Sequence, residues 1–348
     1  MERKLTAIDL FSGCGGLTLG LRSAGFEVVA AVEIDRKAAE TYRANHPQVP
    51  LIESDIRSVS SEHLLAKADL TKGELDLLAG CPPCQGFSTM RSKNGKAPAD
   101  DPRNGLIDDF SRLAIQLRPK MVMMENVPAL ANYPKFQDFV CRLRAAGYEV
   151  VHSVVDVGDY EVPQRRRRLI LVASRISTPT LAAASSARRS VRDAIGHLSS
   201  PGSTGDELHD RTASRRTARV QAIIEAIPKD GGSRSSLPEN LKLKCHNSTS
   251  GFNDVYGRMA WDHQAPTITG GCNNPSRGRF IHPSDDRVIS LREAAMLQGF
   301  PGDYIFSLSH GKESLALMIG NALPPKFIEM QGLEMRRNLS GVKDKAAD

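Results

Sequence analysis

The first half of the chain alternates short apolar runs with segments of helical periodicity, and this alternation is the strongest constraint on its fold. Apolar runs that read as strands span residues 5–11, 28–34, 51–56, 75–79, 121–125, 150–157 and 168–173. Helical patterns separate them at residues 17–24, 38–45, 106–117 and 136–146. Strands alternating with helices predict an α/β fold with a doubly wound, mostly parallel sheet, and the last two runs predict an antiparallel pair. Ligand sites in such sheets lie at the carboxyl ends of the strands.

The pattern changes near residue 174, where serine, glycine, arginine and proline replace the long apolar periods up to about residue 286. Helical patterns in this part remain only at residues 191–198 and 220–227, and regular patterns return at residues 291–297 and 314–319. We therefore expect a larger domain, formed by residues 1–178 plus 290–348, and a smaller, loop-rich domain at residues 179–289. The charged tail, residues 343–348, is expected to be disordered.

Composition supports a globular protein and leaves the nature of its partner open. The chain has 46 Lys and Arg against 40 Asp and Glu, and arginines cluster at residues 165–168, 188–189 and 211–219. Such clusters are commonest as solvated surface charge, yet binding to the phosphates of a nucleic acid requires the same residues on one face. No apolar stretch is long enough to predict a membrane span. Scattered cysteines and a start without a signal peptide favour a reducing cytoplasm.

A glycine-rich turn, Phe11-Ser12-Gly13-Cys14-Gly15-Gly16-Leu17, joins the first predicted strand to the first helix. Glycines there let backbone N–H groups approach a ligand closely, although the same residues also make an ordinary tight turn. The spacing differs from the G-x-G-x-x-G of dinucleotide folds. Glu33 ends the second strand, where a carboxylate can bind a ribose hydroxyl, and Asp55 ends the third, where it can accept from an adenine amino group. Together these features predict a nucleoside-bearing cofactor.

The segment Cys81-Pro82-Pro83-Cys84-Gln85-Gly86-Phe87-Ser88 places two thiols after a predicted buried strand. Its C-x-x-C spacing also fits a redox pair or half a zinc site. A zinc site needs two further ligands, and the nearest pair, Cys245 and His246, is remote; a redox pair usually opens a helix, whereas a loop follows here. We therefore expect Cys84 to be a nucleophile, Cys81 to pack beneath it as a small hydrophobe, and no metal to be bound.

Two further segments place charged groups beside predicted strands. Glu125 ends an apolar run and is either a salt-bridged structural carboxylate or a proton donor and hydrogen-bond partner. Gln164 precedes four consecutive arginines, residues 165–168. Because alternate residues of a strand share a face, Arg166 and Arg168 are expected to face one way. A solvent-facing edge strand is the simpler explanation, but four arginines in a row favour contact with an anion or substrate for one alternate pair.

These motifs occur in an order that resembles the DNA (cytosine-5) methyltransferases. The order is F-x-G-x-G-G, P-P-C-Q, E-N-V, Q-x-R-x-R, a variable region, then R-E-A-A-M-L-Q-G-F-P at residues 292–301 and G-N-A-L-P-P at residues 320–325. The match runs from about residue 5 to residue 330 and is weak only in the variable region. Each motif alone is unspecific, but the ordered set is highly specific. The resemblance implies a Rossmann-like class I methyltransferase fold, with a target-recognition domain as the smaller domain.

The resemblance also implies a cofactor, S-adenosyl-methionine, whose product is S-adenosyl-homocysteine. By similarity, the cofactor binds over the glycine-rich turn, with Glu33 at the ribose and Asp55 at the adenine. Ile34 stands where some relatives place an aromatic residue, so weaker stacking on adenine is expected. The residues implied in cofactor binding are Phe11, Gly13, Gly15, Gly16, Leu17, Glu33, Ile34, Asp55, Ile56, Pro83, Leu106, Asn321 and Ala322.

The implied chemistry explains the residue types at the predicted catalytic site. C5 of cytosine becomes nucleophilic when a thiolate adds to C6, and the resemblance gives this role to Cys84. Glu125 would hold the N3/N4 edge of the base, and Arg166 and Arg168 would hold its carbonyl and neighbouring groups. A duplex hides both carbons, so the target base has to flip out of the stack. No residue is identified as the base that removes the C5 proton, and water is a candidate.

Double-stranded DNA is the implied partner. Thr267 belongs to a segment similar to the core of target-recognition domains, and residues 270–279 would form a recognition loop. In such a loop arginine suits guanine and asparagine suits adenine, although phosphate contact is the simpler assignment for any one side chain. The residues implied in DNA binding are Gln85, Ser88, Arg91, Gln164, Thr267, Asn273, Arg277 and Arg279.

Two other functions remain open from the sequence. One branch of the family methylates a tRNA cytosine, but it lacks a large variable domain such as residues 179–289. A catalytically inactive DNA-binding homologue would not need Cys84, Glu125, Arg166 and Arg168. We therefore expect a sequence-specific DNA methyltransferase of a restriction–modification or phage-defence system. It is expected to act as a monomer in the prokaryotic cytoplasm, at the nucleoid and away from membranes. No motif predicts its recognition sequence.

Overall fold

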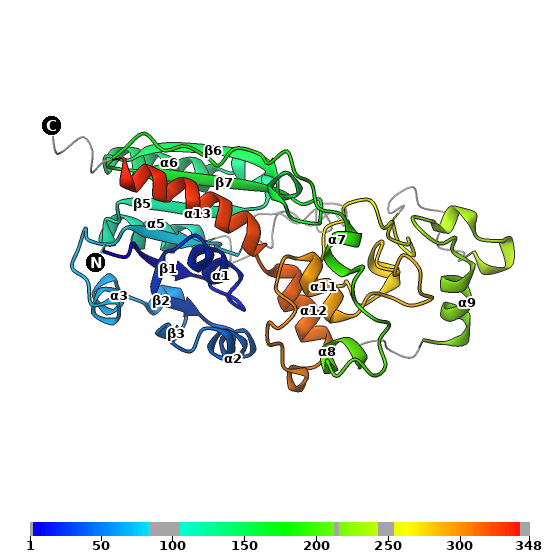
Figure 1. The fold of residues 1–348 in the computed structure, drawn as a ribbon. Helices are drawn as coiled ribbons and strands as arrows, with labels where there is room; N and C mark the ends of the chain where they lie inside the picture. The colour runs from blue at the N-terminus through cyan, green and yellow to red at the C-terminus, as the bar shows by residue number, and fades with distance from the viewer. Residues whose placement is uncertain (1–2, 84–104, 212–215, 243–253, 342–348) are drawn as a thin grey trace. The chain divides into compact units, whose positions relative to one another are not determined.

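The computed structural model describes residues 3–83, 105–211, 216–242 and 254–341, which form two compact units (Figure 1). The first unit contains Met1–Val157, Arg167–Ala184 and Pro325–Asp348, and the second contains Gly158–Arg166 and Ser185–Pro324. Residues 290–324, which we expected in the larger domain, therefore belong by compactness to the second unit. The functional division into a catalytic and a recognition part remains a prediction.

A seven-stranded sheet forms the centre of the first unit, in the order β3-β2-β1-β4-β5-β7-β6. Its strands are β1 (Thr6–Leu10), β2 (Glu27–Glu33), β3 (Leu51–Glu53), β4 (Leu77–Gly80), β5 (Met121–Asn126), β6 (Glu149–Asp156) and β7 (Arg167–Ser174). Neighbouring strands are parallel except at β7, which runs antiparallel to both β5 and β6. The sheet confirms the predicted α/β, doubly wound and mostly parallel fold, including its antiparallel pair.

The helices of the first unit cover this sheet and supply much of its core. They are α1 (Gly16–Ser23), α2 (Arg36–Asn45), α3 (Ser61–Ala68), α5 (Leu106–Leu117), α6 (Pro134–Ala145) and α13 (Pro325–Ser340), with the 3-10 segments η1 (Ile56–Ser58) and η5 (Pro128–Asn132). Helices α5 and α6 pack through Phe110 and Phe139, whose ring centroids lie 5.6 Å apart. Helix α1 packs so closely on α13 that a Cβ at Gly20 would lie 2.4 Å from the backbone oxygen of Pro325.

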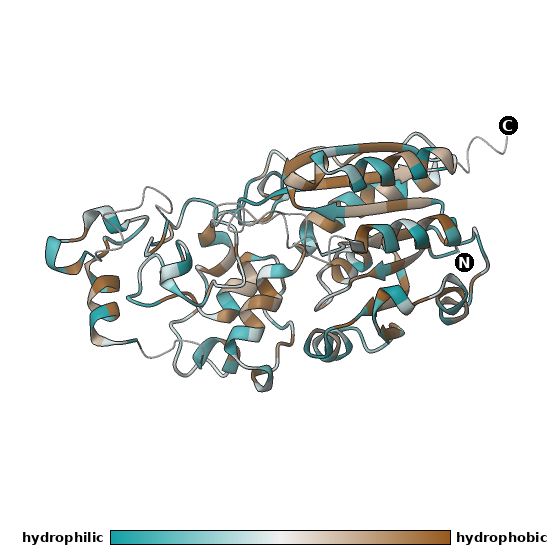
Figure 2. Ribbon diagram, turned by 180° about the vertical axis from the view of Figure 1, so that it is seen from behind, coloured by the Kyte–Doolittle hydropathy of each residue, from teal (hydrophilic) through white to brown (hydrophobic). Residues whose placement is uncertain are grey.

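The central strands are mostly apolar, as is usual for strands with both faces covered by helices, with Asp9 in β1 and Glu125 and Asn126 in β5 as polar exceptions. All residues of β4 and β5 are buried. Alternate positions such as Leu78 and Val122 belong to one continuous core with residues of α3, α5 and α6. Figure 2 shows the strands largely in the colour of hydrophobic residues. The charged and polar groups of the site therefore come from the strand ends and the segments that follow them.

The second unit is loop-rich, as expected. Its elements are η6 (Val157–Tyr160), which begins at the boundary, α7 (Val191–Ile195), α8 (Glu207–Asp210), α9 (Ala218–Ala226), η7 (Arg234–Ser236), η8 (Glu239–Leu241), η9 (Pro275–Arg277), α11 (Leu291–Leu297), η10 (Leu308–His310) and α12 (Lys312–Asn321). Where the structure describes this unit, isolated β-bridges take the place of a sheet. Its core is held in part by the fully buried Arg258, which donates to the backbone oxygens of Ile224, Ile227, His282 and Asp285.

Candidate active site

The glycine-rich turn and Glu33 meet at the carboxyl edge of the sheet. After β1, Gly13 adopts a left-handed backbone conformation with φ of 55°, and Gly15, the N-cap of α1, has φ of 98°. The N–H of Gly13 donates to Oε2 of Glu33 at 2.7 Å, and the N–H groups of Ile34 and Asp35 donate to Oε1 at 3.0 and 2.7 Å. Because a carboxylate oxygen accepts about two hydrogen bonds, Oε2 keeps room for one hydroxyl donor.

Burial raises the pKa of Glu33, while these N–H groups act in the opposite direction by stabilising its charged form. Next to it, the N–H of Ser54 donates to the backbone oxygen of Glu33 at 3.0 Å and aligns the ends of β2 and β3. Asp55 follows as the N-cap of η1 and accepts from the N–H of Arg57 at 3.0 Å. The side chain of Ile34 is 63% exposed, so it is available to cover a flat ligand face.

The other predicted cofactor residues lie in both units, and each is described within its own unit. In the first unit, Phe11 has φ of 62°, a conformation that bulky residues rarely adopt, while Leu17 and Leu106 are buried at the starts of α1 and α5. In the second unit, Asn321 ends α12 and Ala322 is its C-cap. Gly16 and Ile56 are buried, and Pro83 is half-buried. Contact of these residues with a cofactor remains a prediction.

Asp9, for which no role was predicted from the sequence, is a fully buried carboxylate of β1. The hydroxyl of Thr18 donates to its Oδ2 at 2.6 Å and lies 2.8 Å from the hydroxyl of Tyr42. Its Oδ1 has no hydrogen-bond partner among the described residues. Burial raises the pKa of Asp9 to about 7. The sequence feature that could have identified Asp9 is a single acidic residue within a predicted buried strand.

Glu125 is the best-defined member of the predicted catalytic group. It lies near the end of β5 with a side chain that is 2% exposed, and its Oε1 is 2.8 Å from Nε of Arg168 in β7. The thiol of Cys81 donates to its Oε2 at 2.9 Å. The amide of Asn126 donates to the backbone oxygen of Pro82 at 2.8 Å and ties the end of β5 to the segment after β4. The packing of Cys81 beneath Cys84 remains a prediction, and the thiol of Cys81 has in addition a hydrogen bond to the carboxylate that was not expected from the sequence.

Cys84, Gln85, Ser88 and Arg91 lie outside the described residues. The nucleophilic role of Cys84 and the DNA contacts of the other three therefore remain predictions. The described residues before this gap end at Pro83. The preceding residue, Pro82, accepts the hydrogen bond from the amide of Asn126 through its backbone oxygen.

The four consecutive arginines alternate as predicted. Arg165 and Arg167 are exposed, Arg166 is buried, and the side chain of Arg168 is 15% exposed. The two inward arginines belong to different units, since Arg166 ends a segment of the second and Arg168 lies in β7 of the first. Arg168 forms an ion pair with Glu125, which is the salt-bridged state that the sequence left open as one of two alternatives for this carboxylate.

Gln164 and Arg166 bind backbone groups of the second unit. Gln164 is fully buried, accepts from the N–H of Ile268 at 3.0 Å, and donates to Oε1 of Gln298 at 2.5 Å. Arg166 donates from Nη1 to the backbone oxygens of Ile268 at 3.2 Å and Gly320 at 2.9 Å. The predicted contacts of Gln164 with DNA and of Arg166 with the base remain predictions.

The predicted DNA-contacting residues of the second unit differ in how free their side chains are. The hydroxyl of Thr267 donates to the backbone oxygen of Arg165 at 2.8 Å. Asn273 is buried, and its amide donates to Glu313 at 2.7 Å. Arg277 is exposed. Nη1 of Arg279 donates to the backbone oxygens of Gly231, Gly232 and Arg258, and its Nε donates to Asp254.

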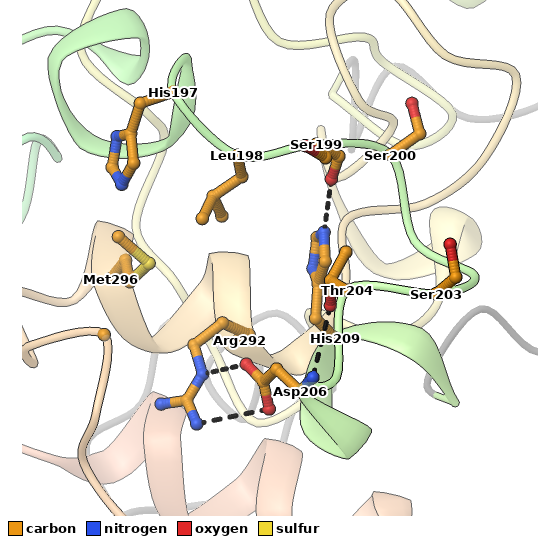
Figure 3. A pocket seen from close by; sticks show the side chains of 11 residues that line it. His197, Leu198, Ser199, Ser200, Ser203, Thr204, Asp206, His209, Arg292 and Met296 are labelled. Atoms are coloured by element: carbon orange, nitrogen blue, oxygen red, sulfur yellow. Dashed lines mark hydrogen bonds and ion pairs between the residues drawn. The ribbon is translucent and has the colours of Figure 1, made fainter.

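A cavity of about 480 Å³ lies within the second unit, and none of the predicted site residues lines it (Figure 3). Arg292 and Asp206 in its wall form an ion pair at 2.5 Å. His209 hydrogen-bonds the hydroxyl of Ser290 and the backbone oxygen of Ser199. Because these groups are engaged with one another, the cavity offers no convergent set of charged groups for catalysis.

The described residues contain neither a cluster of metal-binding side chains nor a helix that could span a membrane. Within residues 3–83, 105–211, 216–242 and 254–341, no group of three or more His, Cys, Asp and Glu side chains could hold a metal ion. No helix in this part of the chain is long and apolar enough to cross a membrane.

Comparison with known proteins gives a consistent result. A family model described as C-5 cytosine-specific DNA methylase matches residues 5–337. The chain is 38% identical to the type II methylase M.HgiDII of Herpetosiphon aurantiacus, over 97% of each chain. It is 33% identical to the type II methyltransferase M1.HphI of Haemophilus parahaemolyticus, over 92% of this chain and 84% of the relative.

Solved structures agree on the fold. A DNA modification methyltransferase encoded within a prophage of E. coli matches with a TM-score of 0.71 at 24% identity, covering 97% of this chain and 100% of the other. The Dnmt2 methyltransferase of S. pombe matches with a TM-score of 0.60 at 18% identity, covering 96% and 99%. At these identities the matches show a shared methyltransferase fold alone.

Proposed function

Because the chain belongs to the family of C-5 cytosine-specific DNA methylases, we propose that it methylates C5 of cytosine in a specific sequence of double-stranded DNA. The proposed methyl donor is S-adenosyl-methionine, and the proposed nucleophile is Cys84. The observation that carries the proposal is the buried carboxylate of Glu125, bound by Arg168 and Cys81 at the carboxyl edge of the sheet. A carboxylate oriented in this way suits the amino edge of a cytosine.

The residues around the glycine-rich turn fit S-adenosyl-methionine. The remaining acceptor position on Oε2 of Glu33 suits a ribose hydroxyl, and the exposed side chain of Ile34 suits an adenine face. Gly13 and Gly15 keep side chains away from the turn. When bound, S-adenosyl-methionine supplies an electrophilic methyl group. No metal is required by this chemistry.

Each catalytic side chain then has one task. The thiolate of Cys84 adds to C6 of the flipped base and raises the electron density at C5. Glu125 accepts from the N4 amino group with the acceptor capacity that Arg168 and Cys81 leave on its two oxygens. Arg168 and Cys81 hold the carboxylate in place, so it need not reorganise when the base arrives.

The test is transfer of a tritiated methyl group from S-adenosyl-methionine to duplex DNA, with tRNA as a parallel substrate. We expect label in DNA only, none with Cys84→Ser or Glu125→Gln, and full transfer with the control Cys141→Ser, since Cys141 is an exposed cysteine of α6. Duplex DNA containing 5-fluorocytosine should trap a covalent adduct with Cys84, because its C5 substituent cannot leave as a proton. Absence of label from both nucleic acids would refute the proposal.

The relatives named as type II enzymes support a role in restriction–modification or a related phage defence. We propose a monomer that acts on DNA at the nucleoid in the cytoplasm. Bisulfite sequencing of DNA from cells expressing the protein should reveal one methylated sequence motif. Methylation scattered without a motif would contradict sequence-specific recognition.

A further inference from the structure

In the second unit, the end of α12 touches the segment that follows Ile268. A Cβ built on Gly320 would lie 2.2 Å from both the nitrogen of Gly270 and the carbonyl carbon of Thr269. Real Cβ atoms essentially never approach other atoms so closely, so only glycine allows these two backbones to pack together. The contact joins two predicted sites, because Gly320 precedes the cofactor residue Asn321 and Thr269 follows the DNA residue Thr267.

Arg166 clamps both sides of this contact. Its Nη1 donates to the backbone oxygen of Ile268 on one side and to that of Gly320 on the other, at 3.2 and 2.9 Å. A guanidinium nitrogen carries two hydrogens, so one nitrogen can serve both carbonyl groups. Arg166 is 5% exposed and Ile268 is fully buried, so water competes poorly for these bonds.

A second polar link runs parallel to the first. Gln164 accepts from the N–H of Ile268 at 3.0 Å and donates to Gln298 at 2.5 Å. The amide of Gln298 in turn donates to the backbone oxygen of Ala322. Both glutamines are fully buried, and a buried hydrogen bond left unmade costs about 1–3 kcal/mol. Neither segment can therefore shift alone without breaking several such bonds.

We propose that this contact couples the binding of the cofactor to the binding of DNA, an inference that rests on the proposed function. A cofactor held at Asn321 fixes the end of α12, and the Gly320 contact with its two polar links fixes Thr267 and Ile268 for the target nucleotide. Arg166 is accordingly a positioning residue for both sites. By thermodynamic linkage, DNA must raise affinity for the cofactor by the same factor as the cofactor raises affinity for DNA.

The experiment measures one ratio, the dissociation constant of duplex DNA without S-adenosyl-homocysteine divided by that with saturating S-adenosyl-homocysteine. Fluorescence anisotropy at fixed salt, with a duplex carrying the mapped methylation sequence, supplies both values. For the wild-type protein we expect a ratio within the usual range for coupled sites, roughly 5- to 150-fold. Gly320→Ala and Arg166→Lys should reduce the ratio to below about twofold. The matched control is Gly302→Ala, whose new Cβ would lie 4.0 Å from its nearest neighbour and should keep the wild-type ratio.

Melting temperature and the affinity for S-adenosyl-homocysteine alone separate coupling from damage. If Gly320 and Arg166 have only a structural role, their substitution should lower the melting temperature and the affinity for S-adenosyl-homocysteine. The ratio of the two DNA dissociation constants should then stay at the wild-type value. If Gly320→Ala does not fold, Arg166→Lys, which keeps the charge, decides the question. A wild-type ratio near one, or a wild-type ratio in folded Arg166→Lys, overturns the inference. Failure of the wild-type protein to bind S-adenosyl-homocysteine at all would instead refute the proposed function.

Discussion

Replacing Arg168 with glutamine tests the contact on which the catalytic assignment depends. The substitution keeps a polar side chain but removes the charge that faces Oε1 of Glu125 at 2.8 Å. The carboxylate is 2% exposed and would lose its cationic partner while the hydrogen bond from Cys81 remains. Both the stability of the first unit and methyl transfer should therefore fall.

The size of the stability loss follows from the geometry. At an effective dielectric constant of about 20, unit charges at this separation attract by about 6 kcal/mol, most of which offsets the cost of removing both ions from water. Breaking one side of a buried pair typically costs about 3–5 kcal/mol. Since Arg168 is 15% exposed and Cys81 still donates to Glu125, we expect a value near the lower limit, about 3 kcal/mol. At about 2–4 °C per kcal/mol, the melting temperature should fall by roughly 6–12 °C.

The assay is a double-mutant cycle of Arg168→Gln and Glu125→Gln, followed by urea unfolding. Circular dichroism is the suitable signal, because the single tryptophan, Trp261, lies in the second unit and the salt bridge in the first. The double variant pairs two neutral amides, so its loss should be smaller than the sum of the two single losses by about 2 kcal/mol. An interaction energy below about 0.5 kcal/mol would refute the ion pair and its role in holding Glu125.

Three further substitutions have expected outcomes. Cys84→Ser should abolish tritium transfer, whereas Cys81→Ser should keep much of it, because a serine hydroxyl can also donate to Glu125; the reverse pattern would overturn the assignment of the nucleophile. Ile34→Ala should weaken S-adenosyl-methionine binding by about tenfold in calorimetry, since about two buried methylene equivalents are lost from the ligand face. Burial raises the pKa of Asp9 to about 7, so its contribution to stability is complete below about pH 4 and is lost as pH rises towards 7, by a shift on the order of 4 kcal/mol. In urea unfolding, the free energy of unfolding of the wild-type protein should fall between pH 4.5 and pH 7.5, and Asp9→Asn should remove this fall. An equal fall in both proteins would show that another group is responsible.

The central sheet was predictable because its pattern is local. Apolar runs and intervening helical periods locate the strands, and β3 is shorter than predicted since Asp55 already caps η1. Helix α13 was missed, although Phe327, Ile328 and Met335 repeat at helical spacing and are buried against the first unit. This apolar spacing is hard to assign from the sequence, because the loop-rich residues that precede α13 in the chain belong to the second unit and α13 belongs to the first.

The partners of the predicted side chains depend on contacts that are remote in the sequence. Alternation correctly separated Arg166 from its exposed neighbours, but Arg166 bonds Ile268 and Gly320, which are 102 and 154 residues away. Likewise, a C-x-x-C spacing does not reveal that Cys81 lies beside Glu125, 44 residues further along. The spacing of residues in the sequence predicts which face of a strand or helix carries a side chain. The residues that this side chain contacts are determined only by the packing of the folded chain.

The arginine content of the second unit has a structural explanation that composition alone could not separate from DNA binding. Arg258 is fully buried and bonds four backbone carbonyl groups, and Arg279 bonds three, so both satisfy backbone in a unit that lacks a sheet in its described part. A bidentate pair with guanine needs two free donors on one edge of the guanidinium. Arg279 already uses Nε and Nη1, so reading a base would require it to release Asp254 or the backbone. We therefore expect Arg277, which is exposed, rather than Arg279 to contact a guanine if the predicted loop reads one. Arg277→Ala should relax sequence specificity, whereas Arg279→Ala should first destabilise the fold.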